Sequence, residues 1–586
     1  MKKRTLAFLL SACMILSLAA CAPAPAPTQT PAPGFFKAGT YTATADGRNG
    51  PVEVEVTFTA DRMDAVTVKS HKETAGIADP ALAQIPASIV EHQSLAVDAI
   101  AGCTITSNAI LAAVTDCVTQ AGGDVAALQA KEIIQKVADD ETITTDVVIA
   151  GGGIAGLSAG IEALDAGAKV VLVEKMPNVG GSTSLSGGKI LAANSYVQKA
   201  LNIEDSPAIF ADYLNNISRG KADPAFIQCV TESSAATVDW LVAHGVQLKN
   251  EVETPLPDML PKRGLMALDD KGASFITPLK TSFEQKGGSL LLETAATELI
   301  TDTAGSVVGL VATRADGSKL TVHAGAVVLA TGGFTGNPEL LEKYAPSYKV
   351  FRSNAGAGNT GDGLLMAERV GADIFAQDCL IAQLADLGPT MRFDAVGLYV
   401  SASGARFMNE NLARPRKARA SIEAIGKEQA YYIHDASEVT DKMAAALEAG
   451  TAFEADSLEA LAGKIGADPA ALTATVTRYN ALCASGTDAD FGKDAAAMKP
   501  ISLDGKLYAI ALKINTAGTT GGPRINLSAQ VLKKDSQPIP GLYAAGEVAS
   551  GSFFAFEYPG SGSAIQCYTT FGRIAGQNSA KEALSK

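Results

Sequence analysis

The sequence predicts an α/β protein whose largest domain is built around a parallel sheet, and three neighbouring features predict it. The apolar run DVVIA at 146–150 is typical of a buried parallel strand. It leads into a turn at 151–156 with the spacing G-x-G-x-x-G, after which a helix is expected. A second apolar strand at 169–173 ends at Glu174, whose carboxylate would accept hydrogen bonds from an adenosine ribose. Together they predict a Rossmann-like dinucleotide-binding unit.

Each glycine of this turn has its own physical reason. Gly151 lets the chain turn tightly, Gly153 lets the backbone approach a pyrophosphate, and Gly156 lets the helix pack close to the sheet. The helix that begins with Ile154 and Ala155 would offer free N–H groups and a positive dipole end to the phosphates. The alternative is a glycine-rich turn without a ligand.

The composition limits the possible functions. A chain of 586 residues should hold two to four domains and can bury a large core. The net charge of −14 disfavours nucleic acid as a partner, because nucleic acid requires a basic face. The 5 histidines and 8 cysteines show no CxxC, CxxCH or clustered spacing, so we expect no metal, iron–sulfur or haem site.

The first 21 residues have the pattern of a signal peptide. Three basic residues at 2–4 precede an apolar run at 6–20 that is short for a membrane span. The sequence LAAC resembles a lipoprotein signal in which Cys21 is lipidated and becomes the mature N-terminus, with an ordinary signal peptide as the alternative. A Pro-rich spacer at 22–34 would hold the folded part off the membrane. We therefore expect a lipid-anchored protein on the outer face of the cytoplasmic membrane.

Residues 35–123 are predicted to form a small separate α+β domain. Alternating patterns at 40–45, 52–59 and 65–70 predict three strands. The segment DAIAGCTITS at 98–107 follows and precedes a helix. This domain resembles the FMN-binding domain in which FMN is attached to a threonine through a phosphodiester bond.

The FMN-binding resemblance implies that a flavin transferase attaches FMN covalently to Thr104. The segment differs from the family pattern D-x-x-S-G-A-T-x-T-S at Ala101 and Cys103. The alternative role for Thr104 is an ordinary helix N-cap hydroxyl. Residues 124–143 form a linker, which we expect to be a polar helix over 124–140.

From residue 144 onward the chain resembles the FAD-dependent fumarate reductases and the related urocanate and enoate reductases. A second loop rich in glycine and serine follows Glu174, and the segments VVLATGG at 327–333 and GLYAAGE at 541–547 also match. The resemblance favours non-covalently bound FAD over NAD. Beyond the turn and Glu174, the FAD-binding residues that it implies are Lys175, Gly180, Gly181, Ser182, Ser186, Gly187, Gly188, Thr331, Gly332, Asp362 and Glu547.

The same resemblance implies how the domains are arranged. Residues 144–371 and 516–586 would form the two parts of the FAD-binding domain. An α+β clamp domain at 372–515 would be inserted between them. An active site is then expected between the FAD domain and the clamp, where closure can exclude water.

Reduction of an activated C=C bond requires a hydride from the flavin and a proton from the protein. The motif RFMNENLAR at 406–414 resembles the segment that carries the proton donor of the fumarate reductases, which implies that Arg414 is the donor. A carboxylate would reprotonate it, and Asp386 and Asp394, together with Arg392, are the candidates nearby. The alternative for Arg414 is a surface charge.

The substrate-binding donors of the fumarate reductases are absent. The segment AGTTGG at 517–522 lacks their two histidines, and the aromatic segment at 553–562 lacks their arginine. Fumarate and urocanate are therefore disfavoured, and a larger, flatter and more apolar acid such as an arylacrylate is expected. Arg524 is either a replacement carboxylate ligand or a surface arginine.

Two alternative functions remain open. Tyr558 and Gly562 have the spacing of the ketone-binding tyrosine and glycine of the 3-ketosteroid dehydrogenases, which would indicate an enone oxidoreductase. The second alternative is an electron carrier that passes electrons through FMN and FAD to a protein partner. Arg414, the anchor and the FMN domain favour a reductase supplied by a membrane quinol or flavin donor.

Overall fold

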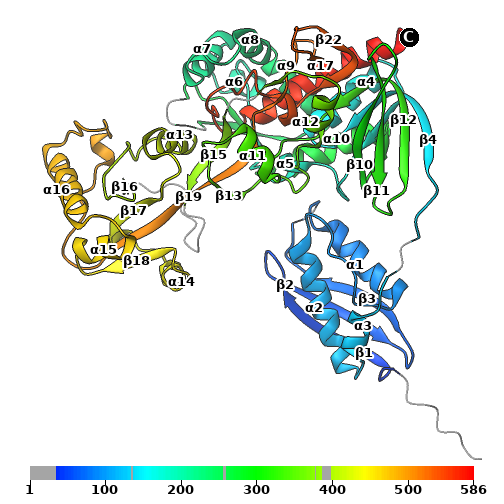
Figure 1. The fold of residues 1–586 in the computed structure, drawn as a ribbon, viewed down its shortest axis with the longest axis horizontal. Helices are drawn as coiled ribbons and strands as arrows, with labels where there is room; N and C mark the ends of the chain where they lie inside the picture. Colours follow the sequence, from blue (N-terminus) through cyan, green and yellow to red (C-terminus); the bar gives the residue numbers. More distant parts are fainter. Residues whose placement is uncertain are drawn as a thin grey trace, which may run out of the picture.

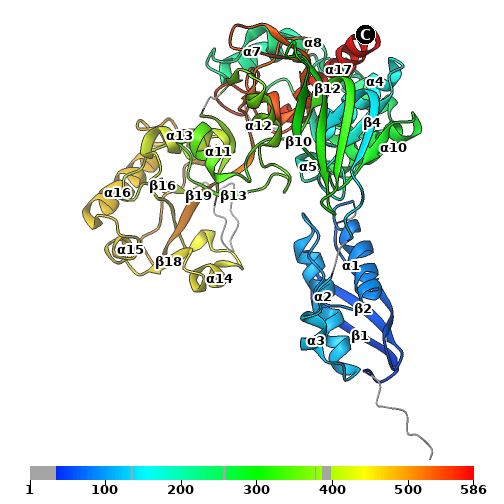
Figure 2. The same ribbon diagram turned by 45° about the vertical axis from the view of Figure 1, so that its right-hand side comes forward.

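The computed structural model describes residues 35–586 except 75, 134–135, 255, 257–258, 376–377 and 386–396. The predicted signal peptide, Cys21, the Pro-rich spacer, Asp386, Arg392 and Asp394 lie outside the described residues. Figures 1 and 2 show three parts: an N-terminal domain, a main domain, and an inserted domain on another side of the main domain. Within the described part of the chain, no helix has the length and apolar character needed to cross a bilayer.

The N-terminal domain contains the three predicted strands, β1 (Gly39–Asp46), β2 (Pro51–Phe58) and β3 (Met63–Ser70), in one antiparallel sheet. Alternate side chains of β2, from Val52 to Phe58, are buried. They form a core with helices α1 (Asp79–His92) and α2 (Thr104–Gln120). Strand alternation therefore predicted this sheet correctly.

The prediction of a helix over 124–140 is wrong beyond the first turns. Helix α3 covers only Val125–Gln129, and the Asp124 side chain caps it by accepting from the Ala127 amide at 3.0 Å. The described residues from 131 to 140 are not helical. Hydrogen bonds to the main domain hold this segment instead: the Ala138 amide donates to Asp316 and the Lys319 amide to Asp140.

The main domain is built around an eight-stranded sheet in the order β10-β11-β12-β4-β5-β9, with β22 beside β12 and β21 beside β22. Strands β12, β4, β5 and β9 run parallel, as the buried apolar runs predicted. The strands are β4 (Glu141–Ala150), β5 (Val170–Val173), β9 (Ser289–Leu291), β10 (Thr294–Thr301), β11 (Val307–Arg314), β12 (Lys319–Leu329), β21 (Gln530–Leu532) and β22 (Pro538–Ala544).

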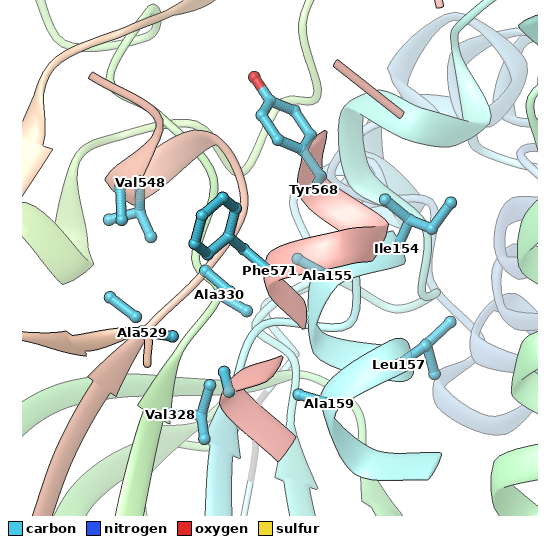
Figure 3. Close-up of a cluster of buried hydrophobic side chains, with 14 of the residues drawn as sticks. Ile154, Ala155, Leu157, Ala159, Val328, Ala330, Ala529, Val548, Tyr568 and Phe571 are labelled. Carbon is cyan, nitrogen blue, oxygen red and sulfur yellow. The ribbon is translucent and has the colours of Figure 1, made fainter. Parts of the chain in front are cut away.

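Helices α4 (Ile154–Asp165) and α17 (Ser563–Leu584) pack closely against each other beside this sheet. A Cβ at Gly572 or Gly576 would lie 2.5 or 2.2 Å from a backbone oxygen of α4, so only glycine permits this approach. Figure 3 shows part of the core, with Phe571 of α17 near Ala155 of α4. The two parts of the FAD-binding domain predicted from the sequence thus share one core.

The inserted domain has a six-stranded sheet whose central strand is β19 (Leu507–Thr519). This sheet takes in β13, which precedes the predicted range 372–515, and β19 continues beyond that range. The other strands are β13 (Val350–Ser353), β15 (Leu380–Ala385), β16 (Leu398–Val400), β17 (Ala430–Asp435) and β18 (Ala452–Ala455), and the helices are α13 (Arg414–Ile425), α14 (Met443–Glu448), α15 (Leu458–Ile465) and α16 (Pro469–Ser485).

Shorter elements complete the main domain. The helices are α5 (Gly181–Ser184), α6 (Tyr196–Ala200), α7 (Pro207–Ile217), α8 (Pro224–Glu232), α9 (Ser234–Ala243), α10 (Ala273–Gln285), α11 (Pro338–Tyr344) and α12 (Asp362–Arg369). The strands are β6 (Lys189–Leu191), β7 (Leu248–Glu253), β8 (Gly264–Ala267), β14 (Ile374–Phe375) and β20 (Gly522–Pro523).

Candidate active site

A cavity of about 980 Å³ lies at the carboxyl ends of the parallel strands. Its wall includes the residues that directly follow β4, β5 and β12. This is where open α/β sheets bind their ligands. Residues of the N-terminal domain line the same cavity, so one space connects the two domains.

The glycine turn fits a pyrophosphate. A Cβ at Gly151 would lie 2.3 Å from the Ala330 oxygen, and a Cβ at Gly156 would lie 1.9 Å from the Gly151 oxygen. A Cβ at Gly153 would meet no atom within 4 Å, so this glycine leaves open space toward the cavity. No side chain caps the first turn of α4, whose N–H groups can therefore bind phosphate oxygens.

Glu174 lies where a ribose-binding carboxylate is needed. It lines the cavity directly after β5 and is buried. One carboxylate oxygen accepts from the Gly152 amide at 2.7 Å, and the other accepts from the Met176 amide at 2.8 Å. Burial raises the pKa of Glu174, and these amide hydrogen bonds act against that rise. The two amides hold the carboxylate at the cavity wall.

The second glycine and serine loop is tied to a segment almost two hundred residues later. Lys175 Nζ donates to Thr360 Oγ1 and to Asp362 Oδ2, both at 2.6 Å. Ser182 Oγ accepts from the Gly356 amide at 3.0 Å. The predicted FAD residues that line the cavity are Gly151, Gly153, Ile154, Ala155, Glu174, Lys175, Gly180, Gly181, Ser182, Ser186, Thr331, Gly332, Asp362 and Glu547. Gly156, Gly187 and Gly188 are not part of this lining.

One end of the cavity is a buried polar cluster around Glu547. Its carboxylate accepts from the Thr519 amide at 2.8 Å and from Asn359 Nδ2 at 3.0 Å. Burial raises the pKa of Glu547 to about 7. Among the described residues, Thr331 Oγ1 and Tyr568 Oη are buried without a hydrogen-bond partner and line the cavity. These atoms are available to polar groups of a bound flavin.

Part of the cavity wall was not predicted from the sequence: Arg352, Ser353, Asn354 and Lys271 also line the cavity. All but Lys271 belong to or adjoin the run SNAGAGNTGDG at 353–363, whose small residues resemble the other cofactor loops and were a usable signal. No sequence pattern distinguishes Lys271.

Thr104 is the first residue of α2, is exposed, and lines the shared cavity. Thr106, two residues later, is buried and its hydroxyl donates to Glu73. The two domains also touch directly, because Asn178 Nδ2 donates to the Gly76 oxygen at 2.9 Å. The structure therefore brings the predicted FMN residue to the wall of the predicted FAD site.

Arg414 is the first residue of α13 and is exposed. It is not among the described residues that line the large cavity. Arg416, Lys417 and Arg419 follow in the first two turns of the helix. Arg416 pairs with Glu557 at 3.5 Å, and Lys417 is buried with its Nζ 5.3 Å from the centroid of the Tyr399 ring.

The motif before Arg414 has a structural role that the sequence analysis did not identify. The Arg406 guanidinium bonds Glu410 through Nε and Nη2, both at 2.7 Å, and Asp488 through Nη1 and Nη2, at 3.0 and 2.8 Å. Lys493 Nζ lies 3.4 Å from Glu410 Oε2. All four side chains are almost completely buried. This network fixes the loop from which α13 starts.

Tyr558 is surrounded by buried protein groups, whereas Arg524 forms an ion pair with Asp373. Tyr558 Oη accepts from the Ala564 amide at 3.5 Å, and burial raises the pKa of Tyr558 to about 12. Arg524 Nε donates to Asp373 at 2.8 Å, and its guanidinium stacks on Phe375 at 4.0 Å. This ion pair favours the surface-arginine interpretation of Arg524 over the carboxylate-ligand one.

Comparisons with known proteins agree with this geometry. Residues 146–565 match the family described as FAD binding domain, and residues 47–119 match the FMN-binding domain. The chain is 32% identical to the NADH:acrylate oxidoreductase of Vibrio harveyi, over 93% of this chain, but spans only 61% of that protein. It is 32% identical to the urocanate reductase of Eggerthella lenta, over 93% and 92% of the two chains.

A solved structure is also similar. The open conformation of a flavocytochrome c3 fumarate reductase aligns with a TM-score of 0.60 and 31% identity. The alignment covers 76% of this chain and 79% of that one. It supports the arrangement of a main domain with an inserted domain.

Proposed function

We propose that this chain, which belongs to the family of the FAD binding domain, reduces the C=C bond of an unsaturated carboxylic acid. An FMN-binding domain precedes the FAD-binding part of the chain. The observation that carries the proposal is the position of Arg414. It begins α13, and later side chains of this helix contact the main domain through Glu557 and Phe556. These contacts support the inference that Arg414, in the first turn of the same helix, acts near the junction of the two domains.

Each component has a defined task. The large cavity would hold FAD, which would supply the hydride, and Thr104 would hold FMN as a source of electrons. The glycine turn and Glu174 hold the dinucleotide, and Asn359, Thr331 and Tyr568 offer hydrogen bonds at the other end. Closure of the inserted domain over the junction excludes water.

Arg414 donates the proton to the α-carbon of the substrate. A guanidinium is not deprotonated by ordinary groups. A carbanion beside a carboxylate is far more basic, so it can take this proton. Asp394 or Asp386, with Arg392, would restore the proton to Arg414, as the sequence analysis expects.

The electron donor and the location rest on the sequence. We propose that lipid on Cys21 anchors the protein on the outer face of the cytoplasmic membrane, and that a membrane quinol or flavin system reduces the FMN. A flavin transferase would load Thr104. The exposed position of Thr104 supports this assignment, because its hydroxyl can be reached from solvent whereas that of Thr106 is buried.

The substrate is proposed to be larger and flatter than fumarate. The support is the absence, at 517–522 and 553–562, of the histidine and arginine donors that would hold a small dicarboxylate. Of the aromatic residues in the second segment, Phe556 lines a small pocket, whereas Phe553 and Phe554 are buried in the core of the main domain.

The test is anaerobic oxidation of a reduced viologen dye by the purified protein with fumarate, urocanate, cinnamate-type acids and 3-ketosteroid enones. We expect turnover with a cinnamate-type acid. Arg414→Ala should keep FAD bound but lower kcat about 10²–10⁴-fold, the usual contribution of a general acid. Arg478→Ala, which changes an exposed arginine of the same domain, serves as the control.

The panel separates the alternatives. Substantial acid reduction by Arg414→Ala would refute its role as proton donor. Activity with steroid enones alone would favour the enone oxidoreductase and Tyr558. A protein that holds both flavins and reduces no alkene would instead be an electron carrier.

A further inference from the structure

A second, smaller pocket lies where four chain segments meet beside α13. Its volume is about 400 Å³. The segments are the turn between α7 and α8, the strand β14 together with Asp378, the helix α13, and the loop that precedes α17. The lining residues are Lys221, Phe375, Asp378, Arg419, Ala555 and Phe556.

Three cationic side chains surround the Phe556 ring. Lys221 Nζ lies 4.4 Å from the ring centroid, and the Cζ atoms of Arg219 and Arg419 each lie 4.6 Å from it. The ring face attracts cations and helps to hold them together. It carries no net charge, however, so it does not neutralise them.

Two of these cations form no ion pair with the neighbouring carboxylates, although the charge of Arg419 acts on Glu557 and Asp378 lines the pocket. Arg219 pairs with Glu423 at 3.5 Å. Neither Lys221 nor Arg419 forms an ion pair with any carboxylate of the described residues. Arg419 Nη2 donates to the Phe556 oxygen at 2.7 Å, while Arg419 Nε is buried without an acceptor in the described part of the chain. Cations in this position favour an anionic ligand.

Hydrogen bonds connect this pocket to the end of the flavin cavity. Cys379 Sγ donates to the Phe556 oxygen at 3.0 Å, and Thr520 Oγ1 donates to the Cys379 oxygen at 2.9 Å. The adjacent residue, Thr519, donates to Glu547 of the cavity wall. Three residues, Cys379, Thr520 and Thr519, therefore connect Phe556 of the pocket to Glu547 of the flavin cavity.

The pocket is also close to the proposed proton donor along α13. Arg419 follows Arg414 by five residues, which corresponds to a rise of about 7.5 Å along a helix axis. The carboxylate and the α-carbon of an unsaturated acid are adjacent, so the two long arginine side chains would converge from this separation on neighbouring atoms of the substrate. Its ring would be covered by apolar surface from Phe375 and Phe556.

We propose that Lys221 and Arg419 bind the carboxylate of the substrate in this pocket. The proposal rests on the proposed function and deepens it, because it names the residues that replace the histidine and arginine donors absent from 517–522 and 553–562. Lys221 contributes a point charge, and Arg419 contributes a directional N–H from Nε. Both remain bound to the carboxylate throughout the reaction, so they lower KM more than they raise kcat.

The test compares an acid with its neutral amide in the complete protein loaded with both flavins. In Lys221→Met, we expect KM for cinnamate to rise about 10-fold with kcat changed less than 2-fold, and KM for cinnamamide to stay unchanged. Lys199→Met, which removes an exposed lysine of α6, is the matched control. An equal change in KM for acid and amide, or no change for either, would overturn the proposal.

A conservative variant guards the test against misfolding, and a binding titration makes it independent of turnover. Arg419→Lys keeps the charge but removes the Nε donor, and it should raise KM for cinnamate alone. Titration with saturated 3-phenylpropanoate, followed by the flavin absorbance, should give a dissociation constant about 10-fold weaker in Lys221→Met than in the wild type. If the wild type reduces no acid, the proposed function is wrong. Independently of turnover, equal binding of 3-phenylpropanoate by the wild type and by Lys221→Met would refute the carboxylate site.

Discussion

Replacing Arg406 by methionine is expected to lower the unfolding temperature of the inserted domain markedly. The Arg406 side chain is 6% exposed, and both of its partners, Glu410 and Asp488, are 0% exposed. In the variant, Lys493 still lies near Glu410, but Asp488 loses both of its guanidinium hydrogen bonds. A buried carboxylate would thus remain without a charged partner.

Breaking one side of a buried ion pair costs about 3–5 kcal/mol. For a domain of this size, each kcal/mol shifts the unfolding midpoint by about 2–4 °C. The midpoint of the inserted domain should therefore fall by about 6–20 °C. Because α13 starts from the loop that Arg406 fixes, turnover should fall as well while FAD stays bound.

The effect also has a predictable pH dependence. Burial alone would raise the pKa of Asp488, but hydrogen bonds from Arg406 and from the Lys493 and Phe491 amides hold that pKa well below its ordinary value. A carboxyl with a lowered pKa stabilises the fold above its unfolded pKa, and this stability is lost as the pH falls through the folded pKa. The advantage of the wild type over Arg406→Met should therefore be largest at neutral pH and shrink below about pH 4.

Differential scanning calorimetry of the flavin-loaded protein measures this difference. Arg478→Met is the matched control, because Arg478 pairs with Asp490 at 2.9 Å on the surface of the same domain, where such pairs contribute about 0–1 kcal/mol. If Arg406→Met unfolds within about 2 °C of the wild type, or if the control is equally destabilised, the buried network does not hold the domain together.

Two further predictions concern the flavin sites. Thr104→Val should lose covalent FMN, seen as in-gel fluorescence of the denatured protein, whereas Thr106→Val should keep it; retention of FMN by Thr104→Val would move the attachment site. In the apoprotein, the folded pKa of Glu547 is about 7, above its unfolded value, so Glu547 binds its proton more tightly in the folded state. The free energy of unfolding should therefore fall by about 3 kcal/mol as the pH rises from about 4.5 to 7. Glu547→Gln should remove this fall in urea unfolding at the two pH values, and an unchanged pH dependence would contradict it.

The local parts of the flavin site could be predicted from the sequence alone. The glycine spacing at 151–156 and the acid at Glu174 depend on backbone conformation and on neighbours within a few residues, and these are encoded locally. The same holds for the three strands of the N-terminal domain, where alternate side chains must face one core. The linker after residue 124 was predicted wrongly because its hydrogen-bond partners lie almost two hundred residues away.

Contacts between residues that are distant in the sequence could not be predicted and become visible in the folded chain. It joins Lys175 to Asp362 and Arg406 to Asp488, and it brings Thr104 to the wall of a cavity made by another domain. It also gathers Lys221 and Arg419 around one phenylalanine ring. Charge pairing and packing across separate segments depend on how the domains dock, and that docking minimises the free energy of the whole molecule rather than of any short stretch of the chain.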